Sequence, residues 1–389
     1  MKKKVILGFS GGVDSAVSAI ILKEQGYDVE GMFMRNWDSA LNYDILGNPN
    51  NPDDICPQEQ DYNDAVEAAR IIGIKLHRVD FVEEYWNKVF MHFIDEYKQY
   101  RTPNPDILCN SEIKFKCFVE KAMEMDADYI AMGHYAKITH KPLKLYRGKD
   151  RNKDQSYFLC MLTKKQLEKA LFPLGDLTKK EVREIARKYK LNIADKKDST
   201  GICFIGERDF DKFLKNYLPA QVGNMETLRG EVVGKHEGLM YYTIGQRKGL
   251  GLGGDKGPWF VLGKDIKRNV LLVGYQEDQE YLYSNRCFAS SFNWLKEDFK
   301  EIEVLAQFRY RSKAVKAKVR RIDKDTIEVK YEPFRAVIPG QAVVFYNNDE
   351  MLGGAVIDEV YQDDQRRLYW WIWLEAQFQE SFISKTILE

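Results

Sequence analysis

The chain has 389 residues, which is enough for two or three domains with at least one well-covered core. Its 44% hydrophobic and 30% charged residues are ordinary for a soluble protein, and no apolar run approaches the roughly 18 residues that a membrane helix needs. Lysine plus arginine and aspartate plus glutamate both number 59, so the net charge points to no polyanionic partner, and any nucleic-acid site has to be a local patch.

The first residues do not read as a targeting signal. Met1–Leu7 is basic and then apolar, but Gly8 follows too soon for the hydrophobic region of a secretory signal. The six cysteines are widely spaced, without a C-x-x-C pair, and only five histidines accompany them. This pattern fits neither a disulfide framework nor a zinc site. We therefore expect a cytoplasmic protein, with no membrane association and no protein-bound metal.

Strands and helices alternate over residues 1–208. Apolar runs predict strands at Lys4–Phe9, Asp28–Met34, Lys75–Asp80 and Tyr129–Gly133. Helical periodicity predicts helices at Val13–Gln25, Tyr62–Ile72, Glu84–Tyr97 and Glu112–Met125, and a capping box at Thr178–Glu181 opens another that ends near Tyr189. Alternation at this spacing predicts an α/β fold with a parallel, doubly wound sheet and helices on both of its faces.

Two smaller parts are expected after this domain, at 209–275 and 276–389. In the first, glycines are frequent, and short strands are predicted at Tyr241–Thr243 and Trp259–Leu262. In the second, apolar residues alternate with bases in Val315–Arg320 and alternation resumes in Thr326–Tyr331, with turn residues between such runs. Short strands at this spacing indicate a small barrel or sandwich. We predict a small central domain followed by a C-terminal β-barrel.

The segment Ser10–Ser15, Ser-Gly-Gly-Val-Asp-Ser, lies directly between the first strand and the first helix. Its two glycines let backbone N–H groups approach an anion, and the helix N-terminus adds partial positive charge. It is neither a Walker A loop nor a G-x-G-x-x-G fingerprint. The plainer alternative is a glycine-rich turn with Asp14 complementing the helix dipole, but this position in the first βα unit is where open α/β sheets bind ligands.

The hexapeptide resembles the signature of the PP-loop ATP pyrophosphatases. Members of that superfamily adenylate a carbonyl oxygen and release pyrophosphate, and they include GMP synthetases, argininosuccinate synthetases, tRNA lysidine synthetases and tRNA thiolases. The loop alone does not choose among them.

Two later segments, Arg101–Asn110 and Ser199–Gly206, each place a cysteine in what reads as a Gly/Pro/Asn-rich loop, Cys109 and Cys203. Such a pair suits sulfur insertion into an activated carbonyl. A persulfide on one cysteine delivers the sulfur, and the thiolate of the other breaks the S–S bond and forms a disulfide. The alternative is that both are small buried hydrophobes, which is what we expect of Cys117, Cys160 and Cys287. Cys56 stays undecided.

The whole chain resembles the bacterial-type tRNA-specific 2-thiouridylases, also called tRNA-uridine 2-sulfurtransferases. The matching segments reach all three predicted domains: Gly8–Ser15, Asn36–Asp38, Thr102–Asn110, Met132–Tyr135, Lys153–Leu159, Gly201–Gly206, Tyr242–Leu250, Arg309–Arg311 and Pro339–Ala342. One departure is Ala16, where many relatives carry a second serine, and the loop 46–55 has no match.

This resemblance implies roles for individual residues. Cys203 would carry the persulfide, Cys109 would be its nucleophilic partner, and Asp106 would be the acid/base. ATP, with Mg²⁺, would contact Gly8, Phe9, Ser10, Gly11, Gly12, Val13, Asp14, Ser15, Met34 and Gly133. The target uridine would be held by Asn104, Pro105 and Asp106. Contacts to tRNA would come from His134, Lys153, Asp154, Gln155, Arg309, Tyr310 and Gln341. The resemblance also implies a cysteine desulfurase or sulfur-relay protein as the donor.

A base that reacts at C2 has to leave its stack, and an unpaired anticodon loop lowers the energy required. Phosphates need basic residues, for which Lys144–Lys153 and Arg309–Arg321 are the candidates. Tyr310 could stack on a base. For Lys316, Lys318 and Arg320 a solvated strand face is an equal alternative.

Two rival functions stay open on the sequence alone. Another PP-loop ligase would need neither cysteine, and a non-catalytic RNA-binding protein would bind tRNA without releasing pyrophosphate. A monomer that meets one tRNA is the simplest assembly. The sequence does not identify the sulfur donor or the tRNA set, nor whether the persulfide attacks directly or through released sulfide.

Overall fold

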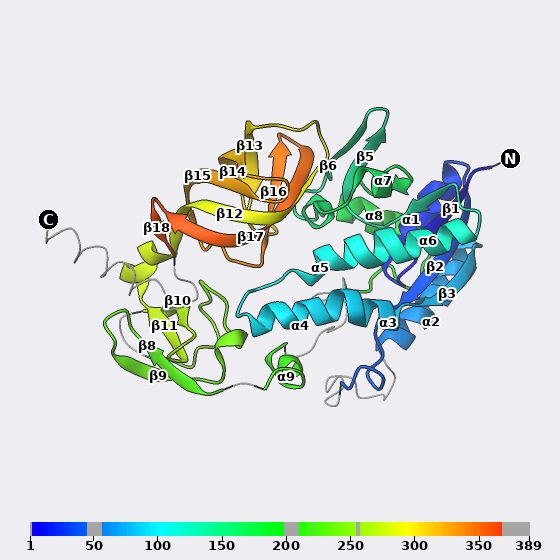
Figure 1. Ribbon diagram of the computed structural model, residues 1–389. Helices are drawn as coiled ribbons and strands as arrows, with labels where there is room; N and C mark the ends of the chain where they lie inside the picture. Colours follow the sequence, from blue (N-terminus) through cyan, green and yellow to red (C-terminus); the bar gives the residue numbers. More distant parts are fainter. Residues whose placement is uncertain (1, 45–56, 198–209, 220, 254–256, 368–389) are drawn as a thin grey trace, which may run out of the picture.

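The computed structural model describes residues 2–44, 57–197, 210–219, 221–253 and 257–367 (Figure 1). Five parallel strands form the first sheet, in the order β3-β2-β1-β4-β7. They are β1 (Lys4–Gly8), β2 (Asp28–Arg35), β3 (Lys75–Asp80), β4 (Tyr129–Ala131) and β7 (Ala170–Leu171). The chain winds outward from β1 in one direction through β2 and β3 and in the other through β4. The predicted doubly wound parallel sheet is confirmed, and its strand order reverses between β1 and β4.

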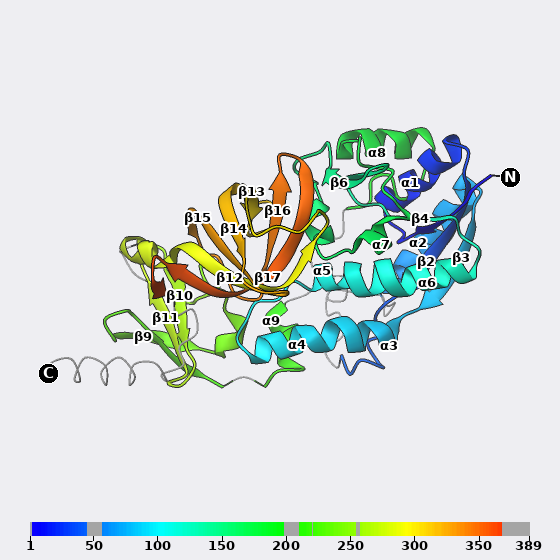
Figure 2. The same cartoon turned by 45° about the horizontal axis from the view of Figure 1, so that its top comes forward.

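Helices cover both faces of this sheet (Figure 2). One face carries α1 (Val13–Glu24), α2 (Pro57–Ile72) and α8 (Lys179–Lys188). The other carries α3 (Val82–Tyr85), η1 (Trp86–Phe90), α4 (Met91–Lys98), α5 (Pro105–Leu108), η2 (Cys109–Cys117) and α6 (Phe118–Glu124). Because side chains alternate along a strand, Val5 and Leu7 enter the first core and Ile6 the second. A strand buried on both faces therefore reads as one apolar run.

The central part is small. After α9 (Phe210–Lys215), a four-stranded sheet has the order β10-β11-β8-β9. Its strands are β8 (Gly223–Glu226), β9 (Val232–His236), β10 (Phe260–Asp265) and β11 (Val270–Gly274). The strand predicted at Tyr241–Thr243 is wrong, because Leu239–Tyr241 forms a short 3₁₀ turn, η4. The Tyr241 hydroxyl donates to the carbonyl of Leu218 (2.7 Å), so this aromatic run reflects burial rather than strand pairing.

Six strands close into the C-terminal barrel, which follows η5 (Gln276–Leu282). They are β12 (Tyr283–Trp294), β13 (Glu301–Gln307), β14 (Val315–Arg321), β15 (Ile327–Arg335), β16 (Ala342–Asn347) and β17 (Glu350–Gln362), and the pairing of β12 with β17 completes the ring. The short strand β18 (Gln365–Arg366) pairs with β17. The predicted barrel and its alternating strands are confirmed.

A hairpin from the first part of the chain extends the barrel sheet. It consists of β5 (Ala136–His140) and β6 (Leu143–Arg147), and β6 pairs with β17 through Met351 and Glu350. The chain then returns through η3 (Ser156–Leu159) and α7 (Lys164–Leu167) to the α/β part. No helix among the described residues is long and apolar enough to cross a membrane.

Candidate functional site

The phosphate-type loop lies where the order of the parallel strands reverses, the position at which open α/β sheets bind ligands. The loop follows β1, and α1 begins at Val13. The Ser10 amide donates to Ser15 Oγ (3.2 Å), whose hydroxyl donates to the Gly12 carbonyl (2.9 Å). Gly11 has a φ of +73°, and a Cβ there would lie 2.1 Å from the Asp61 carbonyl oxygen. Glycine is required at this position both by backbone conformation and by space.

Two lysines that were not predicted as site residues flank this loop. Lys179 Nζ contacts both carboxylate oxygens of Asp14 (2.8 and 2.9 Å), and the Tyr135 hydroxyl donates to the same carboxylate (2.7 Å). Lys179 is the first residue of α8, behind the capping box of Thr178, so the box is the local signal that could have marked it. Its partner lies 165 positions away in the sequence, which no local pattern reveals.

The second lysine, Lys196, donates to the Gly11 carbonyl (3.4 Å) and to the carboxylates of Asp61 (2.7 Å) and Asp64 (2.6 Å). Burial lowers the pKa of this ammonium, but its bonds to the two carboxylates raise the pKa overall. Lys196 therefore stays charged beside the loop.

The other residues predicted to contact ATP surround the same loop. A Cβ on Gly8 would lie 2.6 Å from Met132 Sδ and 3.4 Å from Met34 Cε. A Cβ on Gly133 would lie 3.2 Å from the Ser15 amide nitrogen. The structure thus brings Gly8, Met34 and Gly133 to one place. The predicted residue Phe9 is different, because its side chain is buried in the core between the sheet and α1.

The expected loop around Cys109 is a helix. Proline is favoured in the first helical turn, and here Pro105 opens α5 after Asn104, so the Pro/Asn-rich string marks a helix start. The helix continues as the π-helical stretch η2, whose first residue is Cys109, 2% exposed. Asp106 lies one turn earlier; burial raises the pKa of its carboxyl, and the charge of Lys114 opposes that rise.

His134 connects this helix with the phosphate loop. It follows Gly133, and its ring lies against Phe115 and Phe172, with centroid distances of 6.1 and 6.0 Å. Burial, and then the nearby charge of Lys114, hold the pKa of His134 well below its usual value, so the imidazole is neutral. Its Nδ1 atom has no hydrogen-bond partner in the described part of the chain. His134, which was predicted to contact tRNA, is therefore buried. Besides lowering the pKa of His134, the charge of Lys114 opposes the rise that burial causes in the pKa of Asp106.

The predicted segment Lys153–Gln155 is hydrogen-bonded to Tyr135, whose hydroxyl in turn donates to Asp14 of the phosphate loop. The Gln155 amide donates to the Tyr135 carbonyl (3.0 Å), and the Tyr135 amide donates to Gln155 Oε1 (3.1 Å). Asp154 is buried and accepts from Arg147 (2.9 Å) and from two backbone amides. In this conformation the hydrogen bonds of the Asp154 carboxylate are all made within the protein.

Three residues predicted to contact tRNA come from the barrel side. The Tyr310 ring is centred 4.4 Å from that of Phe158, whose carbonyl accepts from the Asn110 side chain (3.1 Å) beside Cys109. Gln341 Nε2 donates to the Thr102 carbonyl (2.6 Å), two residues before Asn104. Arg309 donates to the Arg335 carbonyl (2.7 Å). Tyr310 and Gln341 therefore border the helix of Asp106 and Cys109.

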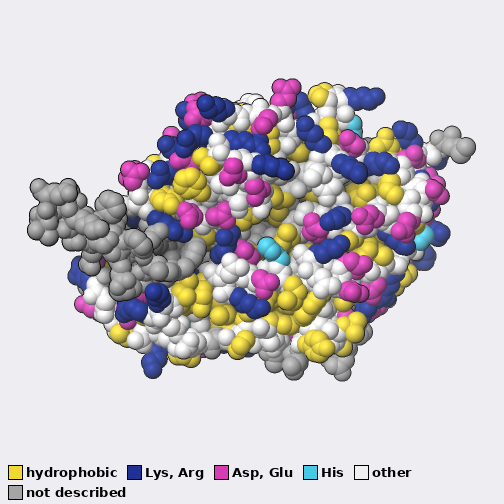
Figure 3. Space-filling model, in the orientation of Figure 1, with side chains coloured by type: hydrophobic (Ala, Val, Ile, Leu, Met, Phe, Trp, Pro, Cys, Tyr) yellow, Lys and Arg dark blue, Asp and Glu magenta, His cyan; other side chains and the backbone are white. Residues whose placement is uncertain are grey.

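The basic strand β14 lies on the outer surface of the barrel. Lys318 pairs with Glu301 (2.7 Å) and Arg320 with Glu328 (2.8 Å), while Lys316 and Lys330 line a hollow of about 720 Å³. Figure 3 shows lysines and arginines along the upper edge of the molecule, over the barrel and the β5–β6 hairpin, with acidic side chains between them. The positive charge of β14 is thus partly neutralised.

Of the remaining cysteines, three lie among the described residues and two do not. Cys117, Cys160 and Cys287 are buried, as predicted, and burial raises the pKa of Cys160 to about 12. No disulfide joins two of the described cysteines. Cys203, with the whole motif Gly201–Gly206, lies outside the described residues, as do Cys56 and the loop 46–55.

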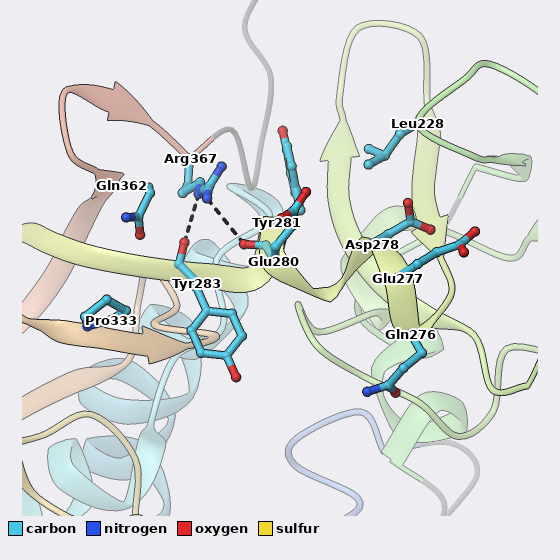
Figure 4. A pocket seen from close by; sticks show the side chains of 10 residues that line it. All are labelled: Leu228, Gln276, Glu277, Asp278, Glu280, Tyr281, Tyr283, Pro333, Gln362 and Arg367. Atoms are coloured by element: carbon cyan, nitrogen blue, oxygen red, sulfur yellow. Dashed lines mark hydrogen bonds between the residues drawn. The ribbon is translucent and has the colours of Figure 1, made fainter.

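A second hollow, of about 660 Å³, lies where η5 and β12 meet the end of β17 (Figure 4). Its wall includes the carboxylates of Glu277, Asp278 and Glu280, and Arg367 donates to the carbonyls of Tyr283 (2.9 Å) and Glu280 (3.3 Å). No residue predicted for ATP or the target base lines it, and its carboxylates would repel phosphates. The candidate site is therefore the region from the phosphate loop to Cys109.

Three family models match consecutive parts of the chain. They are described as a tRNA methyl transferase HUP domain at residues 3–207, a tRNA methyl transferase PRC-barrel domain at 211–275, and an aminomethyltransferase beta-barrel domain at 284–357.

Curated relatives match almost end to end. The chain is 54% identical over 373 residues to the tRNA-specific 2-thiouridylase MnmA of Mycoplasma capricolum, which covers 92% of this chain and 100% of the relative. It is 52% identical over 371 residues to the tRNA-specific 2-thiouridylase MnmA of Bacillus cytotoxicus, covering 94% and 97%.

Similarity to solved structures is more distant. An NMN synthetase from Francisella tularensis is 18% identical with a TM-score of 0.32, covering 54% of this chain and 72% of that one. A 4-thiouridine synthetase–RNA complex with bound ATP is 17% identical with a TM-score of 0.32, covering 56% and 46%.

Proposed function

The chain belongs to the tRNA-specific 2-thiouridylase family, and from this premise we propose that it replaces the C2 oxygen of a tRNA uridine with sulfur. The base would be the wobble uridine of the tRNAs for Lys, Glu and Gln, and ATP would activate it. One observation carries the proposal: the segment Gly133–Tyr135 touches the phosphate loop, and His134 within it packs against Phe115 of η2, the helical stretch that begins at Cys109.

ATP would bind at the loop Ser10–Ser15, with its phosphates on backbone amides and the N-terminus of α1. Lys179 and Lys196 would add positive charge next to the pyrophosphate leaving group. Mg²⁺ would be held mainly by the phosphates themselves, and the described residues contain no group of three potential metal ligands. The role of the metal would be to neutralise phosphate charge.

The reaction would begin when the uridine O2 attacks the α-phosphorus and pyrophosphate leaves with the bonding electrons. The carboxylate of Asp106 would take the N3 proton, which becomes more acidic as O2 is adenylated, and would return it at the end. A pKa raised by burial makes that carboxylate a stronger base.

Sulfur transfer would follow from the two cysteines. The terminal sulfur of a persulfide on Cys203 would attack C2, and AMP would leave with the electrons of the C2–O2 bond. The Cys109 thiolate would then attack Cys203 Sγ, forming a Cys109–Cys203 disulfide and leaving sulfur on the base. The two thiols are oxidised as the sulfane sulfur is reduced, so a thiol reductant and a cysteine desulfurase or relay protein would complete the cycle.

The three parts would divide the work. Residues 1–208 would hold ATP and carry out the sulfur chemistry, 209–275 would form the central domain, and 276–389 would bind tRNA. Contacts to tRNA would come from Lys153, Gln155, Arg309, Tyr310 and Gln341. His134 and Asp154, which are buried in this conformation, would join them once tRNA binding exposes them. The protein would act as a monomer in the cytoplasm.

The decisive test is mass spectrometry of the tRNA product. Purified protein with ATP, Mg²⁺, unmodified tRNA and a cysteine desulfurase should add one sulfur to one uridine. Cys203→Ser should abolish the added mass while ATP binding is retained, because serine cannot form a persulfide. Normal thiolation by this variant would exclude the role assigned to Cys203.

Cys117→Ser is a matched control, because Cys117 is buried in the same helix as Cys109 and has no part in the chemistry. The same reactions separate the rivals. Another PP-loop ligase would keep its turnover with serine at positions 109 and 203, and a non-catalytic RNA-binding protein would release no pyrophosphate.

A further inference from the structure

The segment Tyr100–Asn104, here called the strap, joins the end of α4 to the start of α5. In Figures 1 and 2 this connection lies between the barrel and the central sheet. It joins the helical run α3–η1–α4 to the run α5–η2–α6, at the ends of these runs that are far from the parallel sheet. Asn104 is followed directly by Pro105 and Asp106, so the path of the strap sets where the catalytic helix begins.

The barrel holds the middle of the strap through side chains and backbone. Arg101 donates through both terminal nitrogens to Asp358 Oδ1 (3.1 Å each) and to the Ile357 carbonyl (3.3 Å). The Thr102 amide donates to the Pro339 carbonyl (3.1 Å), and Gln341 donates to the Thr102 carbonyl. The Arg101 side chain is 15% exposed and that of Asp358 is 29% exposed, so water screens this ion pair only in part.

The central domain holds the start of the strap. Lys264 of β10 is 2% exposed, and its Nζ donates to the Tyr100 carbonyl (3.2 Å). Tyr100 itself has a left-handed backbone with a φ of +61°. A buried ammonium with a backbone carbonyl as its partner is a costly arrangement, and it fixes the turn that redirects the chain from α4 into α5.

We propose that the strap is a positioning element, in which the Arg101–Asp358 pair and Lys264 let the two C-terminal parts set the position of Asp106 and Cys109. None of these three anchors touches the reacting atoms, so they are positioning residues. The catalytic part of this inference rests on the proposed thiolation. The physical reason is proximity: a displacement of about 1 Å in a reacting group can lower a rate roughly a hundredfold.

Arg101→Met and Asp358→Asn test the inference, alone and combined, with Arg70→Met as the control. Like Arg101, Arg70 pairs with a carboxylate, but its partner Glu67 is three positions away on the exposed surface of α2. Arg101→Met should lower kcat for tRNA thiolation by roughly tenfold or more, with KM for ATP changed less than about twofold. Arg101 also pairs with Glu96 (2.8 Å), so Arg101→Met removes both ion pairs, whereas Asp358→Asn removes one. Because Asp358 acts through Arg101, the double variant should be no slower than Arg101→Met.

A second measurement does not depend on thiolation. Iodoacetamide labelling of Cys109, followed by peptide mass spectrometry, should become several-fold faster in Arg101→Met, because a loosened strap exposes the start of the helix. Labelling of Cys160 should stay unchanged and serves as the internal reference.

Unchanged labelling of Cys109 in Arg101→Met would overturn the inference, and so would an equal rise at Cys160, which would signify general loosening. If the wild-type protein failed to thiolate tRNA, the proposed function would be wrong, and the labelling experiment would still decide whether the strap positions the helix.

Discussion

Asp106 lies in the first turn of α5, where burial raises the pKa of its carboxyl. A group whose pKa is higher in the folded than in the unfolded state binds more protons when folded, so folding stability falls as pH rises through that window. At neutral pH the charged carboxylate is therefore destabilising, and a buried carboxylate with a perturbed pKa is typical of a residue with a chemical role.

Asp106→Asn should accordingly abolish thiolation while slightly raising the melting temperature at neutral pH, because a neutral amide replaces a poorly solvated carboxylate. The gain in melting temperature should shrink as pH is lowered and the wild-type carboxyl becomes protonated. Thermal melts at several pH values, together with product mass spectrometry, measure both effects. Wild-type activity in the variant would show that Asp106 is not the acid/base.

Residues that act locally were accessible from the sequence, and residues that act across the fold were not. The role of Gly11 and Gly12 could be predicted because the strand, the loop and the helix follow one another directly in the sequence. The roles of Lys179 and Lys196 could not be predicted, because their partners Asp14, Asp61 and Asp64 lie more than a hundred positions away. The helix at Cys109 was misread because Pro and Asn serve helix starts as well as loops.

At the scale of elements, α8 shows how a local signal serves a distant site. Its capping box is complete: Thr178 Oγ1 accepts from the Glu181 amide (3.3 Å), and the Glu181 carboxylate accepts from the Thr178 amide (2.6 Å). The bonds to Lys149 and Thr178 lower the pKa of Glu181 to about 2. The box fixes the first turn of the helix and so directs Lys179 towards Asp14.

Thr178→Ala should therefore lower the free energy of unfolding by about 1 kcal/mol, the usual value of an N-cap, and should also weaken ATP binding. Thr163→Ala is a matched control, because Thr163 forms the same capping box on α7, away from the loop. Urea titration and calorimetric ATP binding measure the two effects. Equal ATP affinity in both variants would mean that the cap does not orient Lys179.

Most elements of the α/β part followed from their periodicity, because each buries a regular face of its own. The β5–β6 hairpin was not predicted. Its side chains are mostly half-buried and its pairing partner, β17, lies some two hundred residues further along the chain. The two-residue strand β7 was missed because it is too short to show alternation.

At the scale of the whole molecule, the joint between the α/β part and the central domain contains Lys264. Burial lowers the pKa of this ammonium to about 7 from its ordinary value of 10.5. Between these values the unfolded chain binds more protons than the folded one, so stability rises with pH across this range. Protonation of the buried Lys264 therefore lowers the stability of the folded protein.

Lys264→Met should remove this pH dependence. From pH 7 to 9 the wild-type protein should gain about 2 kcal/mol of stability that the variant does not gain, as measured by urea unfolding at each pH. Lys98→Met, which removes an exposed lysine of α4, should behave as wild type. Parallel pH curves for wild type and Lys264→Met would show that the lysine is not buried in solution.

The β5–β6 hairpin has a consequence for how this protein could be taken apart or recombined. Strand β6 belongs to the α/β half in sequence but completes its hydrogen bonds on β17, and Leu145 is fully covered there. Excising the α/β half would uncover a ready edge for aggregation. The barrel is thus not an interchangeable attachment: any replacement would have to offer β6 a compatible edge.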